Sequence, residues 1–214
     1  MGIQRLSAAW RNAVVLRFAF VATVCVVVLM VAWTKAAPWL SYPVAMLTEE
    51  VLKHGAPQWT GTMRRDVGRL SVEFAHEVVR PNSGGQRARP TFNADPKRYA
   101  YGLPIFLGLL LAAWITHRAP GRHWRAMLGY LLLLPLQTFS LVMLFLIGMV
   151  RAAQFDQKML AVAPWQLDAI AYCFQLGVLV VPTLGPVLVW LLLDQRFFKE
   201  VIIPGWKSSG GTRQ

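Results

Sequence analysis

Long uncharged, apolar stretches alternate with short basic segments along this chain. Four stretches carry no formal charge: Phe18–Thr34, Tyr99–Thr116, Ala126–Val150 and Ala169–Leu193. A helix rises about 1.5 Å per residue and the hydrocarbon core of a bilayer is about 30 Å thick, so about 20 residues cross it. The last two stretches exceed this length, and the first two approach it with basic or tyrosine residues placed to reach the interface. The pattern predicts an all-α membrane protein with four transmembrane helices.

The first apolar stretch has an alternative interpretation as a cleaved signal peptide, because basic residues precede it. However, the stretch is long for such a signal, and Trp33-Thr34-Lys35 is not a small-residue cleavage site. We therefore expect an uncleaved membrane anchor.

Charge in the short segments predicts the orientation. The N-terminal segment, the link between the second and third stretches, and the C-terminal tail are all rich in arginine and lysine. With four spans these segments share one side, which the positive-inside rule assigns to the cytoplasm. The loop Lys35–Arg98 is then outside, and its basic residues matter little because long loops translocate largely regardless of charge. The expected organisation is an anchor (1–34), an outer loop (35–98), a three-helix membrane region (99–200) and a cytoplasmic tail (201–214).

Composition adds little to the membrane assignment. The net charge of +12 is spread over both membrane faces, so it indicates topology anchors and lipid contacts, and we expect membrane lipid and no nucleic acid as a partner. The two cysteines, Cys25 and Cys173, fall inside apolar stretches at different depths, which predicts packed thiols.

The outer loop is predicted to be helical. Pro43–His54 is one candidate helix, and a second runs from about Met63 to Val79 because apolar residues recur there at helical spacing. The stripe that they would form is the predicted partner-binding surface: Met63, Val67, Leu70, Phe74 and Val78. The kinked face of the last membrane stretch is the alternative.

Two Glu/His pairs in these helices suggest an alternative. Glu50 and His54 are four residues apart, and Glu73 and His76 are three apart, a spacing found in carboxylate-bridged metal sites. A complete site would need further carboxylates, so we expect a solvated polar face and no metal or other cofactor.

Polar and helix-bending residues mark the last two membrane stretches: Pro135, Gln137, Gln175, Pro182 and Pro186. Proline bends a helix, and glutamine is costly against lipid, so both glutamines should point into the bundle. These groups favour ordinary helix packing; the alternative is a polar cavity between spans three and four, as in a transporter or lipid-handling subunit. At the end of the last stretch, Asp194 is expected either to form an exposed pair with Arg196, of little energetic value, or to anchor the tail Phe197-Phe198 along the interface.

The C-terminal half resembles a known family. The residues that carry the likeness are Tyr99–Pro104, Gly129–Gln137, Trp165–Ala171, Gln175–Gly177, Pro182–Pro186 and Leu191–Phe197. They resemble the exosortase H-associated membrane proteins. The resemblance implies a bacterial inner-membrane accessory of an exosortase, the transpeptidase-like enzyme that processes C-terminal sorting tails, in systems linked to surface proteins and exopolysaccharide.

The resemblance does not imply that this chain is the enzyme. An exosortase-type site would need a Cys, an Arg and a His together near the outer face. Cys173 and Arg151 fit that depth, but no histidine follows His123. We therefore predict a non-catalytic partner of an exosortase or of its sorting-tail substrates, with no catalytic residues.

Overall fold

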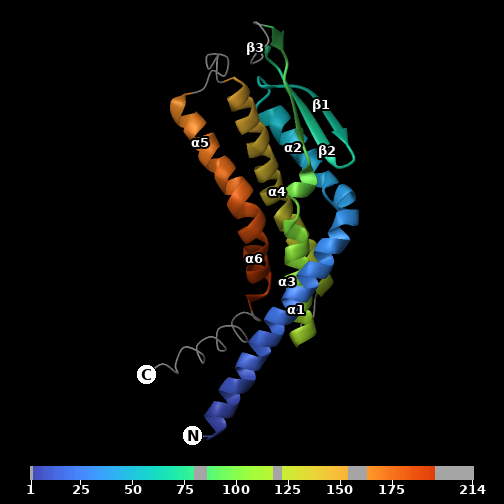
Figure 1. The fold of residues 1–214 in the computed structure, drawn as a ribbon, viewed down its shortest axis with the longest axis vertical. Coiled ribbons are helices and arrows are strands. Elements are labelled where there is room, and N and C mark those ends of the chain that lie inside the picture. The colour runs from blue at the N-terminus through green and yellow to red at the C-terminus, as the bar shows by residue number, and fades with distance from the viewer. Residues whose placement is uncertain (1, 80–85, 118–121, 154–162, 196–214) are drawn as a thin grey trace. The chain divides into compact units, whose positions relative to one another are not determined.

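The computed structural model describes residues 2–79, 86–117, 122–153 and 163–195 (Figure 1). Three helical stretches are long and apolar enough to cross a membrane: α1 (Gly2–Leu40), α4 (Arg122–Ala152) and the continuous stretch Pro164–Leu193. The last one consists of α5 (Pro164–Gln175), a π-helical segment (Leu176–Val180) and α6 (Val181–Leu193). The fourth predicted span appears as α3 (Gly102–His117), an apolar helix of 16 residues. At about 1.5 Å per residue, α3 is about 24 Å long, shorter than a typical hydrocarbon core.

The chain divides into two compact units, and each is described by itself. The first contains residues 1–34, 102–133 and 186–214. Close approach of helices in this unit depends on glycine. A Cβ atom on Gly108 of α3 would lie 2.5 Å from the side chain of Val26 in α1, and one on Gly129 of α4 would lie 2.0 Å from the ring of Phe106 in α3. Because no side chain fits at either position, these glycines let α3 pack directly against its two neighbours.

The second unit contains residues 35–101 and 134–185. Its α2 (Tyr42–Gly55) confirms the helix predicted over Pro43–His54. The segment after α2 forms an antiparallel sheet with the strand order β1-β2-β5: β1 (Thr60–Asp66), β2 (Arg69–Phe74) and β5 (Thr91–Ala94). A short second ladder joins β3 (Val78–Val79) to β4 (Arg87–Ala88), and the 3-10 turn Pro96–Arg98 precedes α3.

The helix predicted over Met63–Val79 is therefore wrong. Asp66 pairs with Arg69 across a two-residue hairpin turn at Val67 and Gly68, and Gly68 has a φ of 79°, which glycine adopts without strain. Burial then alternates along β2, with Leu70, Val72 and Phe74 all buried. The outer loop is a mixed α/β element, which corrects the all-helical loop of the predicted fold class.

The core of the second unit is formed by one face of the sheet, α2 and the C-terminal half of α4. Fully buried side chains at its centre come from all three: Val44 and Leu52 of α2, Leu70, Val72 and Phe74 of β2, and Leu141, Phe145 and Met149 of α4. The sheet also contacts α4 at Gly148, where a Cβ atom would lie 3.2 Å from the ring of Phe92 in β5. The outer loop thus shares its core with α4.

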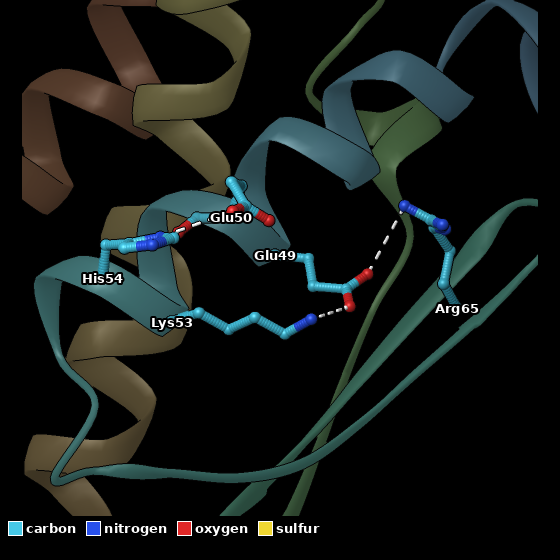
Figure 2. A network of polar contacts seen from close by, with 5 residues as sticks. All are labelled: Glu49, Glu50, Lys53, His54 and Arg65. Atoms are coloured by element: carbon cyan, nitrogen blue, oxygen red, sulfur yellow. Dashed lines mark hydrogen bonds and ion pairs between the residues drawn. The ribbon is translucent and has the colours of Figure 1, made fainter.

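Polar contacts join α2 to β1 at the surface (Figure 2). Glu49 accepts a hydrogen bond from Lys53 one turn later, at 2.6 Å, and its second carboxylate oxygen lies 3.4 Å from the guanidinium of Arg65 in β1. The same guanidinium lies over the ring of Tyr42, 4.8 Å from its centroid. Arg65 therefore connects the sheet to the first residue and to the middle of α2.

Candidate functional site

The five residues of the predicted partner-binding stripe do not form a common surface. Leu70 and Phe74 are fully buried, and Met63 and Val78 are half-buried against the same core. Val67 lies in the hairpin turn and is exposed. Four of the five side chains pack into the core of the outer loop, so the five residues cannot form the helical partner surface that was predicted.

The candidate metal residues are also separated. Glu50 and His54 lie on α2, where the Nδ1 of His54 donates a hydrogen bond to the Glu50 carbonyl at 2.9 Å (Figure 2). Glu73 lies in β2, paired with Thr91 of β5, and the ring of His76 contacts Phe74 edge-on. Across residues 2–79, 86–117, 122–153 and 163–195, no three His, Cys, Asp or Glu side chains gather as metal ligands would.

The two glutamines of the membrane helices differ in burial. Gln137 is buried, and its Nε2 donates to the carbonyl of Ala100 at 3.4 Å, so it points into the protein as predicted. Nearby, burial raises the pKa of the Tyr99 hydroxyl, an effect that the Arg98 guanidinium partly opposes. Gln175, in contrast, is exposed, so the prediction that it points into the bundle is wrong. The pair therefore does not line the polar cavity on which the transporter alternative depended.

The prolines interrupt regular helix at one place. Pro135 lies inside α4 and Pro186 inside α6, and both helices continue through them. Before Pro182 the helix widens into the π-helical segment, where the N–H of Val181 donates to the carbonyl of Leu176, five residues back. This widening accommodates a residue that has no N–H and whose ring crowds the carbonyl four residues earlier. In the next turn, Thr183 donates its hydroxyl to the carbonyl of Leu179 at 2.8 Å.

In the first unit, Asp194 has a different environment from the one predicted. Only 3% of its side chain is exposed, and it accepts a hydrogen bond from the guanidinium of Arg125 at 2.7 Å. Arg196, its predicted partner, lies outside the described residues. The bond connects the end of α6 to the start of α4, and in the same unit the ring of Phe18 in α1 stacks on Trp190 of α6, with centroids 5.7 Å apart. Sequence gave one signal for this pair, since each charge borders an apolar stretch.

An apolar cavity of about 560 Å³ lies in the second unit, between α2, α4 and α5. Val51 and Leu52 of α2, Val142 and Leu146 of α4, and Ala169 and Cys173 of α5 contribute to its walls, and Trp59 and Trp165 also line it. Val51 and Trp165 are exposed, so the cavity opens to the surface. Hydrophobic periodicity gave no sign of this cavity, because the cavity depends on the spacing between α2, α4 and α5.

The membrane part of α1 carries an exposed apolar face. Five side chains on it recur at helical spacing: Leu16, Phe20, Val24, Val27 and Val31. In the most apolar window of α1 only 11% of residues are buried, against 44% in α4 and 33% in the stretch Pro164–Leu193. Of the candidate spans in the described part of the chain, α1 thus has the most surface available to lipid or to another protein.

Family comparison decides what kind of membrane protein this is. A family model described as "Exosortase H-associated membrane protein" matches residues 12–197, which include α1 from residue 12 onward, the outer loop and the remaining apolar helices. The chain belongs to the exosortase H-associated membrane protein family. No curated protein and no solved structure gives a significant match. The resemblance seen in the C-terminal half is confirmed and extends to α1 and the outer loop.

For this family member, the structure gives Arg151 and Cys173 different contacts. Arg151 of α4 lies over the ring of Phe174, 5.8 Å from its centroid, and the free thiol of Cys173 is half-buried and lines the apolar cavity. No contact between a histidine and either residue is found within the described ranges, which end at residue 195. His54 instead bonds within α2.

Proposed function

We propose that this protein is a non-catalytic accessory that binds exosortase H within the membrane. The observation that carries the proposal is the family match over residues 12–197. The family name states an association with exosortase H. An exosortase-type reaction would need a histidine with Cys173 and Arg151, and no histidine follows His123 in the sequence, which supports a partner role.

The exposed face of α1 is the surface that we propose for this partner. Helices associate in a bilayer through packing and interhelical hydrogen bonds, since lipid tails are as apolar as the side chains themselves. A helix that packs little against its own chain can offer its surface to another protein. Leu16 and Val31 are 15 residues apart, so the face extends over about 22 Å, which is most of the hydrocarbon core.

Co-purification tests both statements. A tagged copy is co-expressed with exosortase H, extracted in mild detergent and purified, and the recovered exosortase is quantified. We expect near-stoichiometric recovery with the unmodified chain and a loss when Leu16, Phe20, Val24, Val27 and Val31 are all changed to Ala. The matched control changes exposed leucines of the last membrane stretch: Leu176, Leu179, Leu184, Leu188 and Leu192 to Ala.

The outcomes separate the two claims. No recovery with the unmodified chain would contradict the accessory role itself. Full recovery with the α1 variant would leave the accessory role standing and refute the α1 surface. A loss confined to the control variant would move the contact to the last membrane stretch.

We further propose an inner-membrane location with both termini in the cytoplasm and the outer loop in the periplasm. This orientation requires α3 to cross the membrane despite its 16 residues. A short helix can do so when the bilayer thins locally or flanking residues reach the interface. Alkaline phosphatase, active only after export, should be inactive when fused to the C-terminus and active when fused in the outer loop. Activity at the C-terminus would place that end outside the cytoplasm and contradict the proposed orientation.

A further inference from the structure

The cavity between α2, α4 and α5 has no role in the proposed association, and its chemistry points to a different ligand. We propose that it holds one acyl chain of an outer-leaflet phospholipid, with the lipid phosphate bound at Arg151. The argument rests on depth, size and charge.

Depth follows from α4. The uncharged stretch Ala126–Val150 of this helix ends directly before Arg151. The cavity residues Val142 and Leu146 precede Arg151 by nine and five residues, or about 13 Å and about 7 Å of helix. With the proposed orientation the cavity therefore lies in the outer half of the hydrocarbon core. Acyl chains of the outer leaflet are the surrounding solvent at this depth.

Size and lining suit an acyl chain. The cavity has a volume of about 560 Å³ and mostly apolar walls. A thin, flexible acyl chain can enter it where Val51 and Trp165 are exposed. Filling the cavity restores dispersion contacts that its apolar walls would otherwise lack.

Charge provides the headgroup contact. Within the described residues, Arg151 forms no ion pair, and its guanidinium lies over the ring of Phe174, directly after the cavity residue Cys173. A guanidinium binds phosphate through paired, charge-assisted hydrogen bonds, which are stronger than neutral ones. This bond adds to the packing of the acyl chain in the cavity. A phospholipid that makes both contacts should therefore stay bound during purification, while the other lipids around the protein exchange with detergent.

The test uses purified protein without any exosortase, so it is independent of the proposed function. The full chain is extracted in mild detergent, and bound phospholipid is counted by native mass spectrometry. We expect about one phospholipid per chain. Ala169→Phe places a ring inside the cavity and should lower retention about tenfold, which corresponds to about 1.4 kcal/mol. Arg151→Gln should also lower retention, whereas Tyr172→Trp, which adds bulk on an exposed position of the same helix, should retain the lipid.

Cys173 allows a second measurement that needs no bulky substitution inside the cavity. In a Cys25→Ser chain, N-ethylmaleimide can react only with Cys173. We expect added phosphatidylglycerol to slow this reaction in delipidated protein, and Arg151→Gln to weaken the protection. The proposal is overturned if the unmodified chain retains no phospholipid, or if Ala169→Phe retains as much as Tyr172→Trp and phosphatidylglycerol leaves the Cys173 reaction rate unchanged.

Discussion

The two halves of the outer loop differ in what determines their structure. The helix α2 has contacts between residues that are close in sequence. Lys53 pairs with Glu49 one turn earlier, and the Thr48 hydroxyl donates to the carbonyl of Val44. The strand β2 depends on distant partners, since Leu70 pairs with Ala94 and packs against α4. The comparison teaches that local pattern predicts a segment well only where its decisive contacts are local too.

A buried charge in β2 gives the largest expected effect. Val72 is fully buried in the strand, yet it falls outside the helical stripe predicted from sequence, whereas Val67 falls inside that stripe and is exposed in the hairpin turn. Val72→Asp should unfold the outer loop at a cost of more than about 4 kcal/mol, because an unpaired carboxylate would replace a core side chain. Val67→Asp should be tolerated within about 0.5 kcal/mol.

Limited proteolysis of the detergent-purified variants measures both, because cleavage at the many arginines of the outer loop reports its unfolding. Rapid cleavage of Val72→Asp with slow cleavage of Val67→Asp supports the strand. The reverse order is what a helix over Met63–Val79 would give, and it would contradict the hairpin.

The buried ion pair extends the comparison to the first unit. Asp194 was expected to pair with its neighbour Arg196, but its partner Arg125 is 69 residues away. Asp194→Ala should cost about 3 kcal/mol, because it leaves the Arg125 guanidinium without its partner at a largely buried position. Chemical unfolding in detergent micelles measures the loss. A chain that carries both Asp194→Leu and Arg125→Met should regain stability, which would show that the penalty comes from the unpaired charge. If Asp194→Ala leaves the stability unchanged, the pair does not stabilise the protein.

Sequence alone predicted the apolar helices and α2 because each is encoded by its own residues. Uninterrupted apolar length identifies a membrane helix, and a start signal at Ser41 with a stop signal at Gly55 identified α2. Gln137 was also placed correctly, since a buried glutamine must find a partner in the bundle. Gln175 was not, because the same cost argument cannot tell which face of a helix the rest of the chain covers.

The hairpin was missed because its apolar spacing fits two periods. Leu70 and Phe74 are four residues apart, which suits one helix face and also one face of a strand. The neglected signals were Val72, which completes a period of two, and the Asp66–Arg69 segment with glycine at its third position, a typical tight turn. The cavity could not be predicted, because it depends on how α2, α4 and α5 are spaced.

Replacing one glycine in each half of the outer loop should change the free energy of unfolding by about 1 kcal/mol, in opposite directions. Gly68 in the hairpin turn has a φ of 79°, so Gly68→Ala should destabilise the loop by about 1 kcal/mol or more. Gly55, at the end of α2, has no atom within 4 Å of an added Cβ, so Gly55→Ala should be neutral or stabilising by up to about 1 kcal/mol. Opposite shifts in the denaturation midpoint are expected; a neutral Gly68→Ala would contradict the left-handed turn.

The smallest expected effect concerns the surface network that joins the two halves. Glu49 contacts both Lys53 within α2 and Arg65 on β1, and its side chain is 17% exposed, whereas that of neighbouring Glu50 is 64% exposed. Glu49→Gln should cost about 0.5–1 kcal/mol, at the upper end for surface pairs because two cations lose their partner, and Glu50→Gln should cost less. Raising the salt concentration should reduce the difference between the two variants, since screening weakens such pairs in the unmodified chain as well. Equal stability of both variants at low salt would show that the sheet is held to α2 by the apolar core alone.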